Sequence, residues 1–235
     1  LQYISGSISD TNLLEQLTEL GLEVDQSKKE KNDLLIKLDL TPNRGDCFSL
    51  IGIAREVCAV NNLKLKLPKF KKQQQNLDSK KTISVDKIAC SSYLGQIIKL
   101  KNKGKTPQYI KKTLKAADIG QVNTIVDITN YVMLHTGQPL HAFDNKKIGK
   151  KIYVKFPSKR TKLKLLDGAS HFITKDYLTI CDEKGPIALA GIMGCANSEV
   201  DETTQEIFLE SACFAPASIR GNARKLGFQS EASLR

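Results

Sequence analysis

The sequence predicts an α+β fold. A mostly antiparallel sheet with flanking helices covers residues 84–235, and a small α/β region over residues 1–67 precedes it. Short runs of alternating apolar residues, typical of strands, are separated by tight turns. Helical patterns fall between those runs without the regular alternation that a parallel sheet requires. A Lys-, Gln- and Ser-rich stretch over residues 68–83 has the composition of a linker between two domains.

In the N-terminal region, the leucines of residues 12–20 form one apolar stripe, which predicts a helix that Gly21 closes. Asn12, followed three residues later by Glu15, resembles a capping box at the start of this helix. Residues 34–40 alternate between apolar and polar side chains and predict a strand. A second helix is predicted over residues 49–60, where the apolar residues share one face.

In the C-terminal domain, the same patterns predict strands over residues 93–100, 152–156, 162–166, 177–181, 187–190 and 206–211. Asp167-Gly168 lies between two apolar runs, as in a tight hairpin. Helices are predicted over residues 107–117, 127–135 and 216–226, and Pro107 suits the first position of the first of them.

The charge of the chain favours an anionic partner. Its 235 residues include 36 Lys and Arg against 25 Asp and Glu, a net charge of +11. Nucleic acid, a phosphorylated ligand or a membrane surface fits such an excess. The alternative is a lysine-rich composition that only aids solubility. Seven lysines and no acid lie between Lys99 and Lys115, and a second basic stretch runs from Lys146 to Lys164.

Other features of the composition point to a cytoplasmic protein. No apolar run approaches the ~20 residues that a membrane helix needs, and no signal peptide is recognisable at the start. The six cysteines lack the spacing of metal ligands and several lie in apolar runs. We therefore expect reduced thiols in a reducing compartment, and no metal site.

His141 is the first candidate for chemistry. It follows Gly137-Gln138-Pro139, and the residue before a proline favours extended backbone, so His141 is expected on a loop. A histidine there could position water or a ribose hydroxyl, or act as a base near neutral pH. The alternative is a histidine that caps a turn.

Two further segments could form a site. Ala190-Gly191 and Gly194 end an apolar run, which indicates either close approach of a backbone or a tight turn. Glu210 interrupts another apolar run. It is either solvated or turned inward, where it needs a hydrogen-bond partner such as a ligand hydroxyl. The chain contains no recognisable motif for binding ATP.

Taken together, these segments resemble the beta subunit of bacterial phenylalanyl-tRNA synthetase, in order and spacing from about residue 34 to the end. The matching text is Thr41-Pro-Asn-Arg44-Gly-Asp46-Cys47, Gly52-Ile-Ala-Arg55-Glu56, Val126-Asp127-Ile-Thr129-Asn130-Tyr131, Gly137-Gln-Pro-Leu-His141-Ala-Phe-Asp144, Leu165-Leu-Asp167-Gly168, Ala190-Gly191-Ile-Met-Gly194, Leu209-Glu210-Ser211 and Glu231-Ala-Ser-Leu-Arg235. Two departures are Gly120-Gln121, where the family commonly has Arg-Pro, and Cys195, where it has a further glycine.

The resemblance implies that residues 84–235 are an editing domain, which hydrolyses tyrosine wrongly esterified to phenylalanine tRNA. It assigns catalytic roles to His141, Asn130 and Thr129. It assigns substrate contacts to Glu210, which accepts the tyrosyl phenol, and to Pro139, Ala190 and Gly191. No cofactor or metal is implied for editing.

The resemblance also implies partners. These are tRNA(Phe) and a synthetase alpha subunit, in a heterotetramer of two alpha and two beta subunits. ATP and Mg²⁺ serve the whole ligase outside this region. The family's OB-fold tRNA-binding domain is expected to be missing between the N-terminal segment and Thr41. Two alternatives are a degenerate domain that only binds tRNA and the alpha subunit, and a free-standing deacylase acting in trans.

Overall fold

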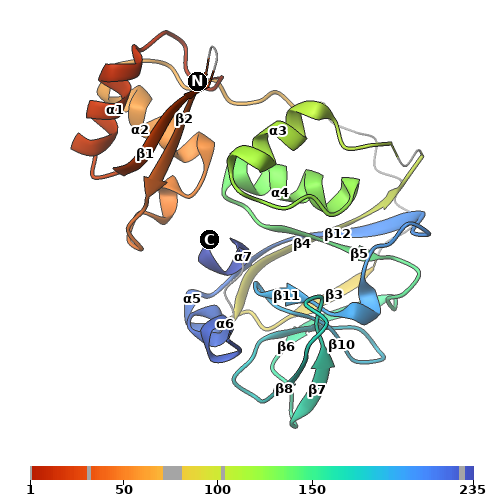
Figure 1. Cartoon of the computed structure of the whole chain (residues 1–235). Coiled ribbons are helices and arrows are strands. Elements are labelled where there is room, and N and C mark those ends of the chain that lie inside the picture. The colour runs from red at the N-terminus through yellow and green to blue at the C-terminus, as the bar shows by residue number, and fades with distance from the viewer. Residues whose placement is uncertain (1, 31–32, 71–80, 102–103, 228–230) are drawn as a thin grey trace. The chain divides into compact units, whose positions relative to one another are not determined.

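The computed structural model describes residues 2–30, 33–70, 81–101, 104–227 and 231–235. The chain divides into two compact units (Figure 1). The first comprises residues 1–74, 112–120 and 131–138, and the second comprises residues 75–111, 121–130 and 139–235. Most of the predicted linker lies outside the described residues, but Thr82 and Ile83 at its end already belong to a strand of the second unit.

In the first unit, two helices pack with an antiparallel hairpin. The elements are α1 (Asp10–Glu19), β1 (Glu23–Glu30), β2 (Asp33–Asp39), a 3₁₀ turn (Gly45–Cys47) and α2 (Leu50–Val60). The predicted start of the first helix is wrong, because Ser9 is its cap and accepts a hydrogen bond from the Asn12 N–H at 3.3 Å. Strand β1 was not predicted, since its side chains are nearly all polar and exposed and give no alternation.

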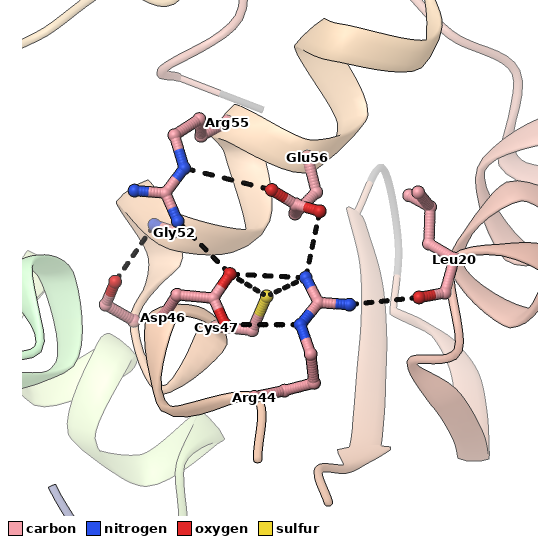
Figure 2. A network of polar contacts seen from close by, with 8 residues as sticks. Leu20, Arg44, Asp46, Cys47, Gly52, Arg55 and Glu56 are labelled. Carbon is pink, nitrogen blue, oxygen red and sulfur yellow. Dashed lines mark hydrogen bonds and ion pairs between the residues drawn. The ribbon is translucent and has the colours of Figure 1, made fainter.

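Arg44 holds the loop between β2 and α2 (Figure 2). Its guanidinium donates to both carboxylate oxygens of Asp46 at 3.2 Å, to Glu56 on α2 at 2.8 Å and to the Leu20 carbonyl at 3.1 Å. The hydrogen bond from Arg44 lowers the pKa of Asp46 to about 2. One planar side chain therefore ties this loop to the end of α1 and to the middle of α2, a geometry that lysine cannot reproduce.

The second unit contains two main sheets and one separate hairpin. The strands are β3 (Thr82–Val85), β4 (Cys90–Lys99), β5 (Leu140–Asp144), β6 (Lys151–Lys155), β7 (Thr161–Lys164), β8 (Ser170–Ile173), β9 (Thr179–Cys181), β10 (Pro186–Leu189), β11 (Met193–Gly194) and β12 (Glu206–Phe214). The sheet orders are β11-β10-β9-β6-β3, β4-β12-β5 and β7-β8. Only the β3–β6 pair among these is parallel, so the predicted α+β class with a mostly antiparallel sheet is confirmed.

The remaining helices are α3 (Gln108–Ala116), α4 (Thr124–Thr136), α5 (Pro216–Ile219), α6 (Asn222–Lys225) and α7 (Glu231–Leu234). The predicted continuous helix over residues 216–226 is wrong. Gly221 lies between α5 and α6 with a φ of 80°, a left-handed conformation that a helix cannot continue through. The described helices include none with both the length and the apolar character to cross a membrane.

The core of the second unit lies between its two main sheets. Phe143 and Phe208 from the three-stranded sheet pack in one cluster with Ile152 and Ile180 from the five-stranded sheet. The opposite face of the three-stranded sheet, which carries Ala142 and Leu209, packs against Ile125 and Val126 of α4. Because side chains alternate along a strand, neighbouring residues of β5 and β12 lie on different sides of this sheet. Figure 1 shows α4 and the five-stranded sheet on its two sides.

Gly95 on β4 is required by this packing. A Cβ atom at this position would lie 2.2 Å from Cζ of Phe208, which is buried in the core. The backbone of β4 therefore approaches the Phe208 ring more closely than any side chain would allow.

We expect Gly95→Ala to destabilise the second unit by about 1–3 kcal/mol, because the added methyl group must displace a packed aromatic ring. Denaturant unfolding measures this change. Gly104→Ala is the matched control, since no atom lies within 4 Å of a Cβ added there. Equal stability of the two variants would contradict this account.

Candidate functional site

The candidate site is built on the middle strand of the three-stranded sheet. Glu210 on β12 lies directly opposite His141 on β5 and directly opposite Gly95 on β4. Residues paired in this way point to the same face of a sheet, with Cβ atoms ~5 Å apart. Two residues separated by 69 positions in the sequence are thus brought together, on the side that faces the five-stranded sheet.

Glu210 is turned inward. It is only 5% exposed, so of the two alternatives left open by the sequence the solvated one is wrong. Its Oε2 atom accepts a hydrogen bond from the Tyr93 hydroxyl at 3.2 Å. Tyr93 lies on β4, two residues before Gly95, and the bare glycine leaves no side chain between Glu210 and β4 on this face. Tyr93 was missed by the sequence analysis, because only the β4–β12 register places it beside Glu210.

Burial controls the charge of Glu210. Desolvation raises the pKa of its carboxyl to about 8, although the hydrogen bond from Tyr93 favours the ionised form. Burial, and then the Glu210 charge, also raises the pKa of the Tyr93 phenol. Near neutral pH the carboxyl is therefore mostly protonated, and a further hydrogen-bond donor would shift it toward the carboxylate.

His141 lies inside strand β5 and not on the expected loop. Pairing with β12 overrides the local preference of the Gln138-Pro139 segment, which only precedes the strand. The ring is partly buried and packs edge-on against Phe143, with centroids 4.5 Å apart. Desolvation lowers its pKa to about 4, so the imidazole is neutral at physiological pH. Among the described residues, no group hydrogen-bonds either ring nitrogen.

The backbone of β11 lies against the His141 ring. A Cβ atom at Gly194 would be 2.6 Å from Cε1 and 2.7 Å from Nε2 of His141. Gly191 turns the chain between β10 and β11 with a φ of 65°, and Ala190 beside it is fully buried. Both sequence interpretations of the glycines therefore apply, a tight turn at Gly191 and a close approach at Gly194.

The other predicted site residues lie elsewhere. Pro139 immediately precedes β5, two residues from His141. Thr129 and Asn130 lie on α4, whose Ile125 and Val126 pack on the face of the sheet opposite to His141 and Glu210. The Thr129 hydroxyl donates to the Val126 carbonyl of its own helix at 2.8 Å. The structure thus places His141 and Glu210 next to each other, and Thr129 does not lie on their face of the sheet.

One surface hollow of the second unit is lined by residues other than this pair. This hollow, at the start of β12, is lined by Lys99, Leu100, Lys101, Lys146, Gln205 and Glu206. No group of three or more His, Cys, Asp or Glu side chains suited to a metal ion occurs in the part of the chain that the structure describes. All six cysteines are free, and five of them are buried.

The pair offers two complementary functions. A buried carboxyl can recognise a hydroxyl group, because a ligand that lacks the hydroxyl leaves the carboxyl without that partner. A neutral imidazole with free nitrogens can accept a hydrogen bond from water or from a ligand hydroxyl. Such a site suits a polar, phenol- or hydroxyl-bearing ligand.

The chain belongs to the B3/4 domain family, whose model matches residues 89–235 and so covers more than half of the chain. Strands β4, β5 and β12, with Glu210 and His141, all lie within the matched region.

Curated relatives extend the similarity to the first unit. The chain is 43% identical over 208 residues to the phenylalanine–tRNA ligase beta subunit of Carboxydothermus hydrogenoformans, covering 88% of this chain and 26% of the relative. It is 37% identical over 238 residues to the beta subunit of Rhodopirellula baltica, covering 100% of this chain and 35% of the relative. The chain therefore spans about a quarter to a third of the length of these relatives.

A solved structure is also similar, an N-terminal fragment of the phenylalanyl-tRNA synthetase beta subunit from Pyrococcus horikoshii. The identity is 19% and the TM-score 0.45, over 91% of this chain and 65% of that one.

Burial of Glu210 predicts how its contribution to stability changes with pH. The native pKa of about 8 lies above the ordinary value of 4.5. The stability that its protonated form supports is fully present below pH 4.5 and is lost as the pH rises through 8. Glu210→Gln, which cannot ionise, should therefore gain stability relative to the original chain between pH 5 and 8, by on the order of a few kcal/mol.

Urea unfolding at several pH values measures this difference. Glu202→Gln, which changes an exposed carboxyl, is the control and should give a small, nearly constant difference. A Glu210→Gln difference that does not grow with pH would contradict a buried, protonated carboxyl.

Proposed function

We propose that this chain is part of a phenylalanine–tRNA ligase beta subunit and that its second unit hydrolyses tyrosine wrongly esterified to tRNA(Phe). The observation that carries the proposal is the direct pairing of His141 with the buried Glu210 on one face of the three-stranded sheet. Similarity to curated phenylalanine–tRNA ligase beta subunits supports the assignment to a ligase subunit. The hydrolysis is what the family resemblance implies for this region.

Such an activity has a physical rationale. Tyrosine and phenylalanine differ by one hydroxyl group, and a hydrophobic synthetic site rejects an added hydroxyl poorly. A second site that requires the hydroxyl discriminates well, because phenylalanine leaves its buried polar group unpaired. Glu210 is a buried polar group of this kind in the second unit.

The carboxyl can accept a substrate phenol alongside Tyr93. The Tyr93 hydroxyl occupies Oε2, and a carboxylate offers two oxygens with about four lone-pair directions in all. The substrate phenol then donates to the remaining positions. A second donor stabilises the carboxylate, so binding the phenol favours loss of the Glu210 proton.

His141 acts on the ester end of the substrate. Water attacks the carbonyl carbon of the aminoacyl ester, the bond from that carbon to the ribose oxygen breaks, and this oxygen leaves with a proton. The products are free tyrosine and tRNA. Because its pKa is lowered to about 4, His141 is a weak base, and its main role is to orient the water or the ribose hydroxyl by a hydrogen bond. Pro139, Ala190 and Gly191 keep the substrate contacts that the family resemblance assigns. Thr129 and Asn130, to which the resemblance assigns catalytic roles, lie on α4 at the opposite face of the sheet.

The proposal includes the partners expected for a beta subunit. These are tRNA(Phe), the alpha subunit of the ligase in a two-alpha, two-beta assembly, and ATP with Mg²⁺ at the aminoacylation site of the whole enzyme. The proposed hydrolysis itself uses only water and side chains of this chain.

Glu210→Ala should reduce hydrolysis of Tyr-tRNA(Phe) and spare the weak hydrolysis of Phe-tRNA(Phe). The ratio of the Tyr-tRNA(Phe) rate to the Phe-tRNA(Phe) rate should fall by a factor that corresponds to about 1–3 kcal/mol. This is the cost of leaving one buried hydrogen bond unmade. Deacylation of both substrates by the 235-residue chain provides the measurement. An unchanged ratio would reject Glu210 as the group that reads the phenol. Absence of deacylation by the original chain, with tRNA bound normally, would favour the degenerate binding domain.

His141→Ala should slow deacylation, and His141→Asn should recover part of the rate, because asparagine keeps a hydrogen-bonding group. The loss should fall below the 10²–10⁴-fold typical of a general base. Since His141 stays neutral above a pH of about 4, the deacylation rate should not change with pH near pH 6.5 through titration of this side chain. If the rate does rise with pH near pH 6.5, and this rise disappears in His141→Ala, then His141 acts as a base in the substrate complex.

A further inference from the structure

The hairpin of β7 and β8 has one buried and one exposed face. Leu163 and Ile173 point inward and are buried in an apolar cluster of the second unit. The opposite face carries Lys162, Lys164 and Phe172, all exposed. Lys162 is directly paired with Phe172 across the two strands. Figure 1 shows this hairpin protruding from the sheets of the second unit.

Phe172 is an exposed aromatic ring surrounded by cations. It is 53% exposed. The guanidinium of Arg160 lies 4.2 Å from the ring centroid, and Nζ of Lys162 lies 6.0 Å from it. An Arg stacked on a ring extends the flat surface available for stacking and adds positive charge to it.

The charges of this hairpin are unbalanced. Residues 157–176 contain five basic side chains, Lys159, Arg160, Lys162, Lys164 and Lys175, and only two acids, Asp167 and Asp176. Both acids have local partners: Asp167 accepts from the Ala169 N–H and Asp176 from the Thr174 hydroxyl. Among the described residues, none of the five cations forms a salt bridge. With five cations against two carboxylates, the net charge of this hairpin region is positive.

We propose that the exposed face of the β7–β8 hairpin, with Phe172 at its centre and Arg160, Lys162 and Lys164 around it, binds single-stranded RNA. An unpaired base stacks on Phe172 and Arg160, while the lysines contact neighbouring phosphates. Aromatic stacking combined with a positive track is the chemistry by which proteins hold single strands without reading their sequence. One aromatic ring among cations offers too little apolar surface to anchor in lipid.

This surface is separate from Glu210 and His141, and its residues have no part in the proposed hydrolysis. If the RNA is a tRNA substrate, this surface holds one of its unpaired stretches. That part of the proposal rests on the proposed function. The RNA-binding test does not depend on deacylation, so the two proposals fail separately.

The experiment is a titration of the 235-residue chain against a fluorescent, unstructured RNA of about 12 nucleotides, with anisotropy as the readout. Phe172→Ala should weaken binding about tenfold and leave the salt slope unchanged, because stacking releases no counterions. The slope of log K against log salt is negative. Lys162→Ala and Lys164→Ala should each make it less steep, by about 0.7. Phe172→Trp should retain the affinity, since it restores a stacking surface.

Matched controls lie in the turn between β3 and β4. Ile88→Ala removes an apolar side chain that is 92% exposed, and Lys87→Ala removes an exposed lysine. Both should bind RNA more like the original chain than Phe172→Ala and Lys162→Ala do. Circular dichroism establishes that each variant remains folded.

Three results would overturn the proposal. The first is equal weakening by Phe172→Ala and Ile88→Ala. The second is tighter binding to a duplex of the same length than to the single strand, since paired bases cannot stack on the ring. The third is Phe172-dependent binding to vesicles of phosphatidylserine and phosphatidylcholine without RNA binding, which would identify a membrane surface.

Discussion

The pairing of β12 with both β4 and β5 is the constraint on which the second unit depends. This register places Phe208 opposite Phe143 in the core and Glu210 opposite His141 at the site. Because side chains alternate along a strand, a shift of β12 by one residue would move Phe208 and Glu210 to the face that packs on α4, away from Phe143 and His141. The apolar residues therefore fix the register, and the register determines which polar residues meet. The core and the candidate site are specified by the same backbone hydrogen bonds.

The site itself opposes stability. A carboxyl that is only 5% exposed and an imidazole with free nitrogens are both costly to bury, as the raised pKa of Glu210 and the lowered pKa of His141 indicate. The surrounding sheets offset this cost, with glycines at 95 and 194 letting backbone lie close to Phe208 and His141. A folded chain that keeps such groups inside is well suited to bind a ligand that supplies their missing partners.

The positive charge of the chain is used differently in different places. In the first unit, Arg44 is engaged by Asp46 and Glu56, so its charge serves the fold. On the β7–β8 hairpin, the cations surround an exposed ring and have no anionic partner among the described residues. Net charge alone does not distinguish these cases. The distinction comes from whether an acid is held within reach, which is a property of the folded chain.

By itself, the sequence determined the α+β class, the position of most strands and helices, and the segments that carry His141 and Glu210, because periodicity and turn residues are local signals. Only the tertiary structure decided that Glu210 is buried, that His141 belongs to a strand and that Tyr93 binds the carboxyl. Gly221 also ended a helix that the apolar pattern continued. These outcomes depend on pairing between residues up to 117 positions apart, and a single sequence carries no record of which strands pair.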